Sequence, residues 1–174
     1  MTREVNKKKI SPYHVGVSAE AFAAALFARC DCDVLVQYGA NQPEYDLVIS
    51  RETKSIKVSV KDSQDGGWGL TQSGLKEANY HGAIDKWLDK HDRGILFCFV
   101  QFKNVGLSDL PRMYLTRPQE IAKRLKESAS GRGETVLYEE KVWSDRAYAA
   151  RSIDRIPVKW RFTQQKVDEI FAQI

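Results

Sequence analysis

The sequence has few of the residues that build disulfide frameworks or soft-metal sites. Its three cysteines are an odd number, and Cys30-x-Cys32 lacks the two-residue spacing of zinc knuckles. His81 and His91 have no third ligand at metal spacing. We therefore expect reduced thiols and neither a disulfide scaffold nor a histidine-based metal site.

Long hydrophobic runs are also missing. No segment approaches the roughly 18 apolar residues of a membrane span, and the polar residues 1–9 are not followed by a signal-peptide core. This indicates a soluble, cytoplasmic protein without a membrane partner. At 174 residues the chain is long enough for one domain, with residues 1–10 as a flexible tail. The net charge of +4 fits an anionic partner but does not demand one.

Hydrophobic periodicity predicts alternating helices and strands. A helix is expected from Ser18 to about residue 29, with Ser18 as its N-cap. The near-continuous apolar run 94–102 indicates a central strand buried on both faces. Further strands are expected at 33–37, 112–116, 135–138, 141–143 and 156–162, and further helices at 73–79, 80–91, from Pro118, and after Thr163. The pattern predicts an α/β fold with a mixed central sheet flanked by helices.

The stretch from residue 42 to residue 61 reads as two adjacent strands, 45–49 and 55–61, joined by a polar turn. In the second strand the apolar residues alternate with Lys57, Ser59 and Lys61, so a period of two places Ser59 and Lys61 on one face. Lys61 should therefore emerge beside Asp46 of the first strand. A carboxylate and an ammonium placed this way can serve a hard cation and a developing negative charge. Each residue also has a structural interpretation, Asp46 as a turn acceptor and Lys61 as a solvent-facing lysine.

These residues resemble the PD-(D/E)xK nuclease superfamily, which includes restriction endonucleases and archaeal-type Holliday-junction resolvases. The resemblance rests on Pro43 and Asp46 before the turn, on the triplet 59–61 after it, and on Glu20 in a preceding Ala-rich helix. It covers about the first half of the chain. It implies a restriction-endonuclease-like fold and a metal-dependent DNA endonuclease of restriction, resolvase or homing type.

The sequence departs from the superfamily pattern at two places. The acid usually found two residues before the lysine is replaced by Ser59, and Pro43 stands three residues before the aspartate instead of next to it. The resemblance implies that another acid completes the site. Glu77 on a later helix is one candidate, as in some restriction endonucleases, and Glu20 on the first helix is the other, as in the resolvases. Glu20 also has a purely structural interpretation, since the positive end of the helix dipole stabilises a carboxylate in the first helical turn.

The mechanism implied by the resemblance uses Mg²⁺, for which Mn²⁺ can substitute. The expected ligands are Asp46, the main-chain carbonyl of Val60, and Glu20 or Glu77, while Lys61 orients the nucleophile or stabilises the charge on the scissile group. Cleavage of both strands would favour a homodimer or a higher homo-oligomer.

The glycine-rich segment 62–72 contains a single tryptophan, Trp68. If the partner is DNA, Trp68 can stack on a base, and Gln64, Thr71 and Gln72 can donate hydrogen bonds. The alternative is that Trp68 pins this loop to the core. Similarly, the run 7–9 of lysines is either a solvated tail or an arm that contacts phosphates.

Two other functions remain open. A nuclease fold without catalytic activity, binding nucleic acid or protein, would explain the loss of the acid at Ser59. An RNA-processing phosphodiesterase would differ only in its substrate.

Overall fold

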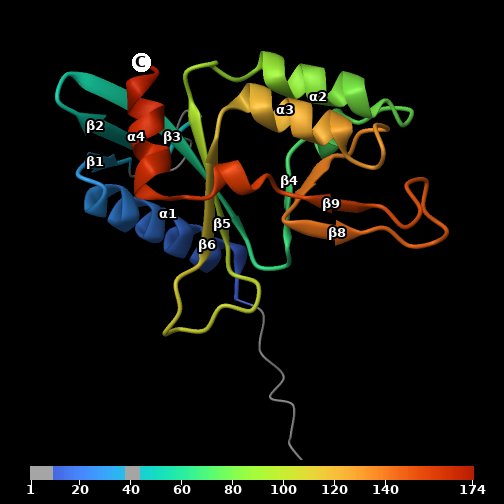
Figure 1. Cartoon of the computed structure of the whole chain (residues 1–174), viewed down its shortest axis with the longest axis horizontal. Coiled ribbons are helices and arrows are strands. Elements are labelled where there is room, and N and C mark those ends of the chain that lie inside the picture. Colours follow the sequence, from blue (N-terminus) through green and yellow to red (C-terminus); the bar gives the residue numbers. More distant parts are fainter. Residues whose placement is uncertain (1–9, 38–43) are drawn as a thin grey trace, which may run out of the picture.

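A five-stranded mixed sheet lies at the centre of the computed structural model, which describes residues 10–37 and 44–174 (Figure 1). The strands occur in the order β1-β2-β3-β5-β6, and only the β3–β5 pair is parallel. Their bounds are β1 (Asp33–Val36), β2 (Leu47–Arg51), β3 (Lys54–Ser63), β5 (Leu96–Gln101) and β6 (Arg112–Thr116). This confirms the predicted mixed sheet.

The β2–β3 hairpin has the predicted position and alternation. Ile49 lies opposite Ile56 and Leu47 opposite Val58, and all four side chains are buried. Strand β3 continues beyond this last pair, so that residues 59–63 are paired only with β5. The edge of β3 that faces β2 is therefore open to side chains along this stretch.

Two helices cover each face of the sheet. Helices α1 (Pro12–Arg29) and α4 (Gln164–Ala172) pack on one face, and α2 (Tyr80–Asp89) and α3 (Pro118–Glu127) pack on the other. Strand β5 is buried on both sides, as its apolar run predicts, with Leu96, Cys98 and Val100 towards α1 and Phe97 and Phe99 towards α3. The layers are therefore helix, sheet, helix (Figure 1).

Helix α1 begins six residues before the predicted start at Ser18. Its N-cap is Ser11, whose hydroxyl accepts a hydrogen bond from the His14 N–H, and Pro12 takes the first helical position. Ser18 lies inside the helix and donates its hydroxyl to the His14 carbonyl at 2.8 Å. The predicted start was wrong because Ser11 and Pro12 already supply the N-cap and the first helical position, and the helix continues through Gly16.

The prediction of a helix at 73–79 is also wrong. Only a 3₁₀ turn, η1 (Gln72–Gly74), forms there. Glu77 and Ala78 both have left-handed backbone conformations, with φ of 49° and 58°, which a right-handed helix does not allow. Helix α2 starts afresh after Asn79, whose side chain accepts from the Gly82 N–H at 2.9 Å.

Two small antiparallel ribbons extend beside the central sheet. The first pairs β4 (Gly67–Gly69) with β7 (Val136–Tyr138), and the second pairs β8 (Glu140–Val142) with β9 (Ile153–Arg155). Strand β4 lies in the segment predicted as a loop. The predicted strand at 156–162 is instead a turn with a short 3₁₀ segment, η2 (Val158–Trp160), in keeping with Pro157 near its start.

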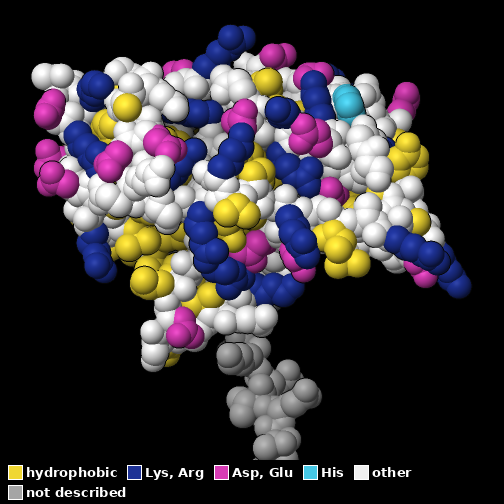
Figure 2. Space-filling view, in the orientation of Figure 1, with side chains coloured by type: hydrophobic (Ala, Val, Ile, Leu, Met, Phe, Trp, Pro, Cys, Tyr) yellow, Lys and Arg dark blue, Asp and Glu magenta, His cyan; other side chains and the backbone are white. Residues whose placement is uncertain are grey.

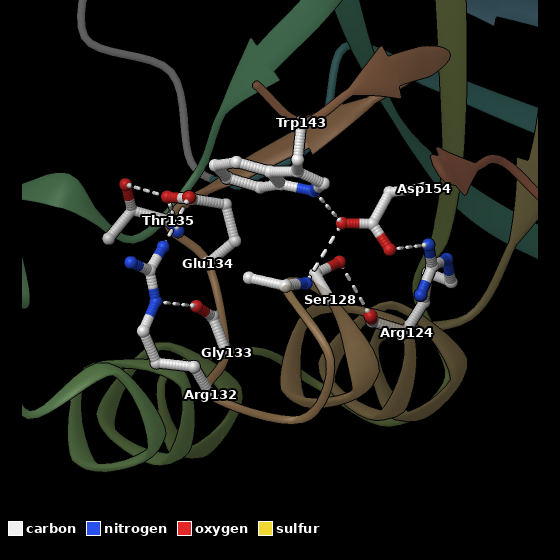
Figure 3. A network of polar contacts seen from close by, with 9 residues as sticks. Arg124, Ser128, Arg132, Gly133, Glu134, Thr135, Trp143 and Asp154 are labelled. Atoms are coloured by element: carbon white, nitrogen blue, oxygen red, sulfur yellow. Dashed lines mark hydrogen bonds and ion pairs between the residues drawn. The ribbon is translucent and has the colours of Figure 1, made fainter. Parts of the chain in front are cut away.

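The β8–β9 ribbon is held to α3 by a polar network centred on Asp154 (Figure 3). Its carboxylate accepts from the Ala129 N–H at 2.9 Å, from the Trp143 ring N–H at 2.7 Å and from Arg124 at 2.8 Å. Burial opposes the ionisation of Asp154, but these three donors outweigh it and lower its pKa. Nearby, Arg132 pairs with Glu134 at 3.0 Å. The network fixes the ribbon, which with its connecting loop carries the basic residues Lys141, Arg146, Arg151 and Arg155.

The three cysteines are free thiols, and all of them are buried. Across residues 10–37 and 44–174, no helix has the combination of length and apolar character that crossing a membrane requires.

Candidate active site

Asp46 lies where β2 begins, and three main-chain or side-chain hydrogen bonds fix it. Its carboxylate accepts from the Val60 N–H at 2.6 Å. Its own N–H donates to the Val58 carbonyl at 2.8 Å, and its carbonyl accepts from the Gln37 N–H at 2.9 Å. Asp46 therefore bridges to the edge of β3 at the level where β2 stops pairing with it.

The carbonyl of Val60 faces the same edge as Asp46. In an extended strand the N–H and C=O of one residue point to the same side, and the Val60 N–H points to Asp46. This carbonyl and the Asp46 carboxylate thus present oxygen atoms towards one region. That these two groups hold a metal ion together stays a prediction.

Lys61 follows Val60 and is half-buried. Its carbonyl accepts a hydrogen bond from the Trp68 ring N–H at 3.0 Å, which ties this point of β3 to the neighbouring ribbon. Ser59 lies two residues earlier on the same strand face and is only 2% exposed. A serine with so little exposure occupies the position of the absent acid.

Glu20 approaches this region from α1. Because α1 begins at Pro12, Glu20 lies inside the helix and not in its first turn, so the helix-dipole interpretation does not apply. Burial raises the pKa of Glu20, and repulsion from Asp46 and Asp62 raises it further, while Lys61 acts in the opposite direction. Glu20 therefore lies within electrostatic reach of both carboxylates and of the lysine.

Asp62 is a charged neighbour of the site that sequence reasoning missed. The second strand was predicted to end at Lys61, whereas β3 continues to Ser63. Alternation along β3 then places Asp62 on the face of Val60, towards α1, where an ideal Cβ built on Gly16 would lie 3.7 Å from the Asp62 Oδ1 atom. A longer predicted strand would have revealed this position.

Glu77, the other candidate for the missing acid, is not on a helix. It lies exposed in the turn before α2. It is not among the charged groups that act on Glu20. The structure thus brings Glu20, Asp46 and Lys61 together, and no contact among the described residues joins Glu77 to them.

The residues predicted to contact nucleic acid lie in different environments. The Trp68 ring is 2% exposed and packs against Phe99 and Tyr114, with ring centroids 5.1 and 6.2 Å away, so it pins the segment to the core and is not available for base stacking. Thr71 is also 2% exposed. Both predictions require correction, because the glycines around Trp68 form strand β4 against β7 instead of an open loop. Gln72 is exposed.

Gln64 is half-buried, and its side chain donates to the Ile10 carbonyl at 2.9 Å. It therefore ties the end of β3 to the residues before α1. Pro43 and the lysine run at 7–9 lie outside the described residues.

The donors at the site suit a hard divalent cation. Carboxylate and carbonyl oxygens are the ligands that Mg²⁺ and Mn²⁺ prefer, and protein Mg²⁺ sites commonly use only one or two carboxylates together with waters and substrate phosphates. In the described part of the chain, no three His, Cys, Asp or Glu side chains converge closely enough to hold a metal ion. The donor set therefore fits Mg²⁺ in kind, through Asp46, Glu20 and the Val60 carbonyl.

The surface charge is mixed on the face seen in Figure 2, where Lys and Arg side chains alternate with Asp and Glu side chains. Several pairs are ion pairs of exposed groups, such as Arg155 with Glu140 at 2.7 Å and Lys159 with Glu120 at 2.8 Å. On this face, basic and acidic side chains are thus interspersed.

Comparison with solved structures identifies the fold. A bacterial homing endonuclease, I-Ssp6803I, matches over 94% of this chain and 97% of its own, with a TM-score of 0.51 and 16% sequence identity. Hjc, a Holliday junction resolvase from Archaeoglobus fulgidus, matches over 71% of this chain and 88% of its own, with a TM-score of 0.42 and 11% identity. We base the fold on the first of these. No family model and no curated protein matches the sequence. The predicted restriction-endonuclease-like fold is confirmed.

Proposed function

We propose that this protein is a divalent-metal-dependent DNA endonuclease whose catalytic residues are Asp46, Lys61 and Glu20. The observation that carries the proposal is the hydrogen bond from the Val60 N–H to the Asp46 carboxylate at 2.6 Å. This bond holds the Asp46 carboxylate next to the main chain of Val60, the residue before Lys61, at the open edge of β3. Glu20, on α1, is close enough to interact electrostatically with Asp46 and Lys61.

Each residue has a distinct role in the proposal. Asp46, Glu20 and the Val60 carbonyl hold the cation. When bound, Mg²⁺ supplies Lewis-acid stabilisation of the phosphate and lowers the pKa of water. Lys61 donates from its ammonium group to the scissile phosphate or orients the attacking water, and its positive charge offsets the negative charge that builds up on the phosphate oxygens.

DNA is the proposed substrate because the chain shares its fold with a homing endonuclease over nearly the full length of both proteins. The net charge of +4 agrees with a polyanionic partner. Cutting both strands would need a second active site, which a two-fold homodimer provides. Gln64 and Gln72 remain the proposed contacts to DNA.

The test is cleavage of supercoiled plasmid and of a synthetic four-way junction by the wild type and by Asp46→Asn. We expect the wild type to cut at least one of them only when Mg²⁺ or Mn²⁺ is present, and Asp46→Asn to lose the activity by a factor of 100 or more. Asp89→Asn, at the exposed end of α2, is the matched control and should cut as the wild type does. Equal cutting by Asp46→Asn would contradict the assignment.

One observation favours a second function, a catalytically silent nuclease fold that binds nucleic acid. Ser59 replaces an acid, and among the described residues no three acidic or other metal-binding side chains converge. In this case the wild type and Asp46→Asn would both bind DNA, and neither would cut it with any divalent cation.

A further inference from the structure

The β8–β9 ribbon has one attached face and one exposed face. Asp154 points towards the end of α3, where Arg124 and the Ala129 N–H hold it, and its register partner Lys141 shares that face. Side chains alternate along a strand, so the neighbouring residues point the opposite way. All of these are exposed, namely Glu140, Val142, Ile153 and Arg155. One whole face of the ribbon is therefore open to a partner.

This exposed face joins an apolar pair to aromatic and basic side chains. Val142 lies opposite Ile153, and the two residues are 62% and 49% exposed. The connecting loop 143–152 carries Tyr148, which is 71% exposed. It also carries Arg146, which is exposed and has no hydrogen-bond or ion-pair partner within residues 10–37 and 44–174. The combination suits a partner that offers both apolar edges and negative charge.

The charge of the ribbon and its loop favours an anionic partner. Residues 140–155 include four basic residues, Lys141, Arg146, Arg151 and Arg155, and three acids, Glu140, Asp145 and Asp154. Asp154 is buried, and Arg124 balances its charge. The two remaining acids form exposed ion pairs with Arg151 and Arg155. Such exposed pairs contribute little to stability, so both arginines can turn to phosphate groups at small cost.

The ribbon begins close to the candidate active site. The Trp68 ring N–H donates to the Lys61 carbonyl at 3.0 Å, and Trp68 lies opposite Leu137 in the β4–β7 pair. Strand β8 starts at Glu140, three residues after Leu137, so at most about 11 Å of extended chain separates the two. Figure 1 shows the ribbon extending from there beyond the central sheet, and Figure 2, in the same orientation, shows Lys and Arg side chains at its far end. A long partner bound at Lys61 is thus within reach of the ribbon.

The ribbon and its loop are held in one conformation by main-chain hydrogen bonds. The Trp143 N–H donates to the Ser152 carbonyl at 3.0 Å, which continues the pairing of β8 with β9 into the loop. Two further main-chain hydrogen bonds of 3.0 Å close turns at 144–147 and 149–152. A surface that is already ordered loses little conformational entropy on binding.

We propose that the exposed face of the β8–β9 ribbon and its loop bind duplex DNA, with the ribbon in the major groove next to the scissile phosphate. The major groove is wide enough for a two-stranded β-ribbon. Val142 and Ile153 contact base edges, where the thymine methyl group offers apolar surface, and Arg146 and Arg151 contact phosphates. The inference rests on the proposal that DNA is the substrate, and it identifies an element that holds the DNA.

Fluorescence anisotropy of a labelled duplex of mixed sequence and several helical turns tests the inference, with EDTA present so that nothing is cut. We expect the double variant Arg146→Ala, Arg151→Ala to bind about tenfold more weakly than the wild type, or weaker still. Its slope of log affinity against log salt concentration should be smaller by about 1.8, because each phosphate contact contributes about 0.9.

The matched control is the double variant Lys86→Ala, Lys90→Ala, which removes two exposed charges from the end of α2 and its C-cap. It should bind the duplex within about threefold of the wild type and keep the wild-type salt slope.

A second pair of variants tests the apolar part of the surface. Val142→Asp places a negative charge on the exposed face of the ribbon and should weaken binding about tenfold. Val158→Asp adds the same charge at a valine that is 84% exposed in η2, and it should bind as the wild type does. Thermal unfolding of every variant, compared with that of the wild type, checks that the fold is kept.

The outcomes separate this inference from the proposed function. If the arginine variant binds the duplex like its lysine control, the inference about the ribbon is overturned, and the proposed function stands if the wild type cuts DNA. If sedimentation velocity shows a wild-type dimer that Val142→Asp loses, the ribbon is a subunit contact and the inference is again overturned. If the folded wild type binds no duplex DNA, both proposals fail.

Discussion

The Asp46 carboxylate accepts a hydrogen bond from the main-chain N–H of Val60 at 2.6 Å, across the point where β2 stops pairing with β3. This contact replaces the missing strand partner of β3 and at the same time orients the acid. One side chain therefore has both a structural and a proposed catalytic role, and mutagenesis must separate them.

The structural role of Asp46 can be measured by comparing the stabilities of two variants, Asp46→Ala and Asp46→Asn. Asp46→Ala leaves the N–H of Val60, a residue 8% exposed, without its partner, and we expect a loss of about 1–3 kcal/mol in the free energy of unfolding. Asp46→Asn retains an oxygen acceptor and should lose less. Urea denaturation of both variants measures the difference, and equal losses would show that the hydrogen bond is not the cause.

We predict that the ionised carboxylate of Glu20 lowers the free energy of unfolding. Its carboxylate is partly buried and repelled by Asp46 and Asp62. Glu20→Gln should therefore raise the melting temperature at pH 7.5 in the presence of EDTA. Excess Mg²⁺ should reduce this gain, because the cation relieves the repulsion in the wild type only. A lower melting temperature for Glu20→Gln in EDTA would contradict the electrostatic account.

The ion pair between Arg112 and Glu139 predicts a pH dependence of stability. Burial opposes ionisation of Glu139, but hydrogen bonds from Arg112 at 2.7 and 2.8 Å and from the Tyr114 hydroxyl at 2.6 Å lower its pKa below the ordinary value of 4.5. A lowered pKa means that this stabilisation is present above pH 4.5 and is lost as the pH falls through the folded-state pKa.

Glu139→Gln should accordingly lower the free energy of unfolding at pH 7 by about 1.5–3 kcal/mol. The difference from the wild type should shrink as the pH falls below 4.5. Denaturation of both proteins at several pH values measures this, and a difference that is constant with pH would contradict the pKa assignment.

The Asp154 network predicts that the attachment of the β8–β9 ribbon to α3 depends on the Asp154 carboxylate. Asp154→Ala removes the partner of Arg124, the Trp143 ring and the Ala129 N–H, and we expect a cost of about 3–5 kcal/mol because the ion pair is buried. Limited proteolysis should then cut within the ribbon first. Asp145→Ala is the control, since its pair with Arg151 is 75% and 83% exposed and should change stability by about 0.5 kcal/mol or less.

Local patterns in the sequence predicted the central sheet well. The alternation in 55–61 and the apolar run at 94–102 follow directly from burial on one face and on two faces, so the β2–β3 hairpin and β5 were placed correctly. The same hairpin led to the prediction of Asp46 and Lys61 as site residues, because strand register fixes which residues lie near one another.

Errors arose where a distant contact decides the structure. The sequence left open whether Trp68 stacks on a base or pins its loop to the core, and its packing on Phe99 and Tyr114 confirms the second alternative. Asp62 was overlooked because β3 continues through pairing with β5, a parallel neighbour more than thirty residues later in the chain. No local pattern in either segment carries this information.

The most direct test of the account is nicking of supercoiled plasmid by the wild type and Lys61→Met, each with Mg²⁺ and with EDTA. Lys57→Met is the control, since Lys57 lies on the same strand, exposed, over the Tyr45 ring. The account predicts that the wild type and Lys57→Met cut only with Mg²⁺, and that Lys61→Met folds and binds the plasmid without cutting it. Cutting by Lys61→Met at the wild-type rate, or cutting by the wild type in EDTA, would contradict it.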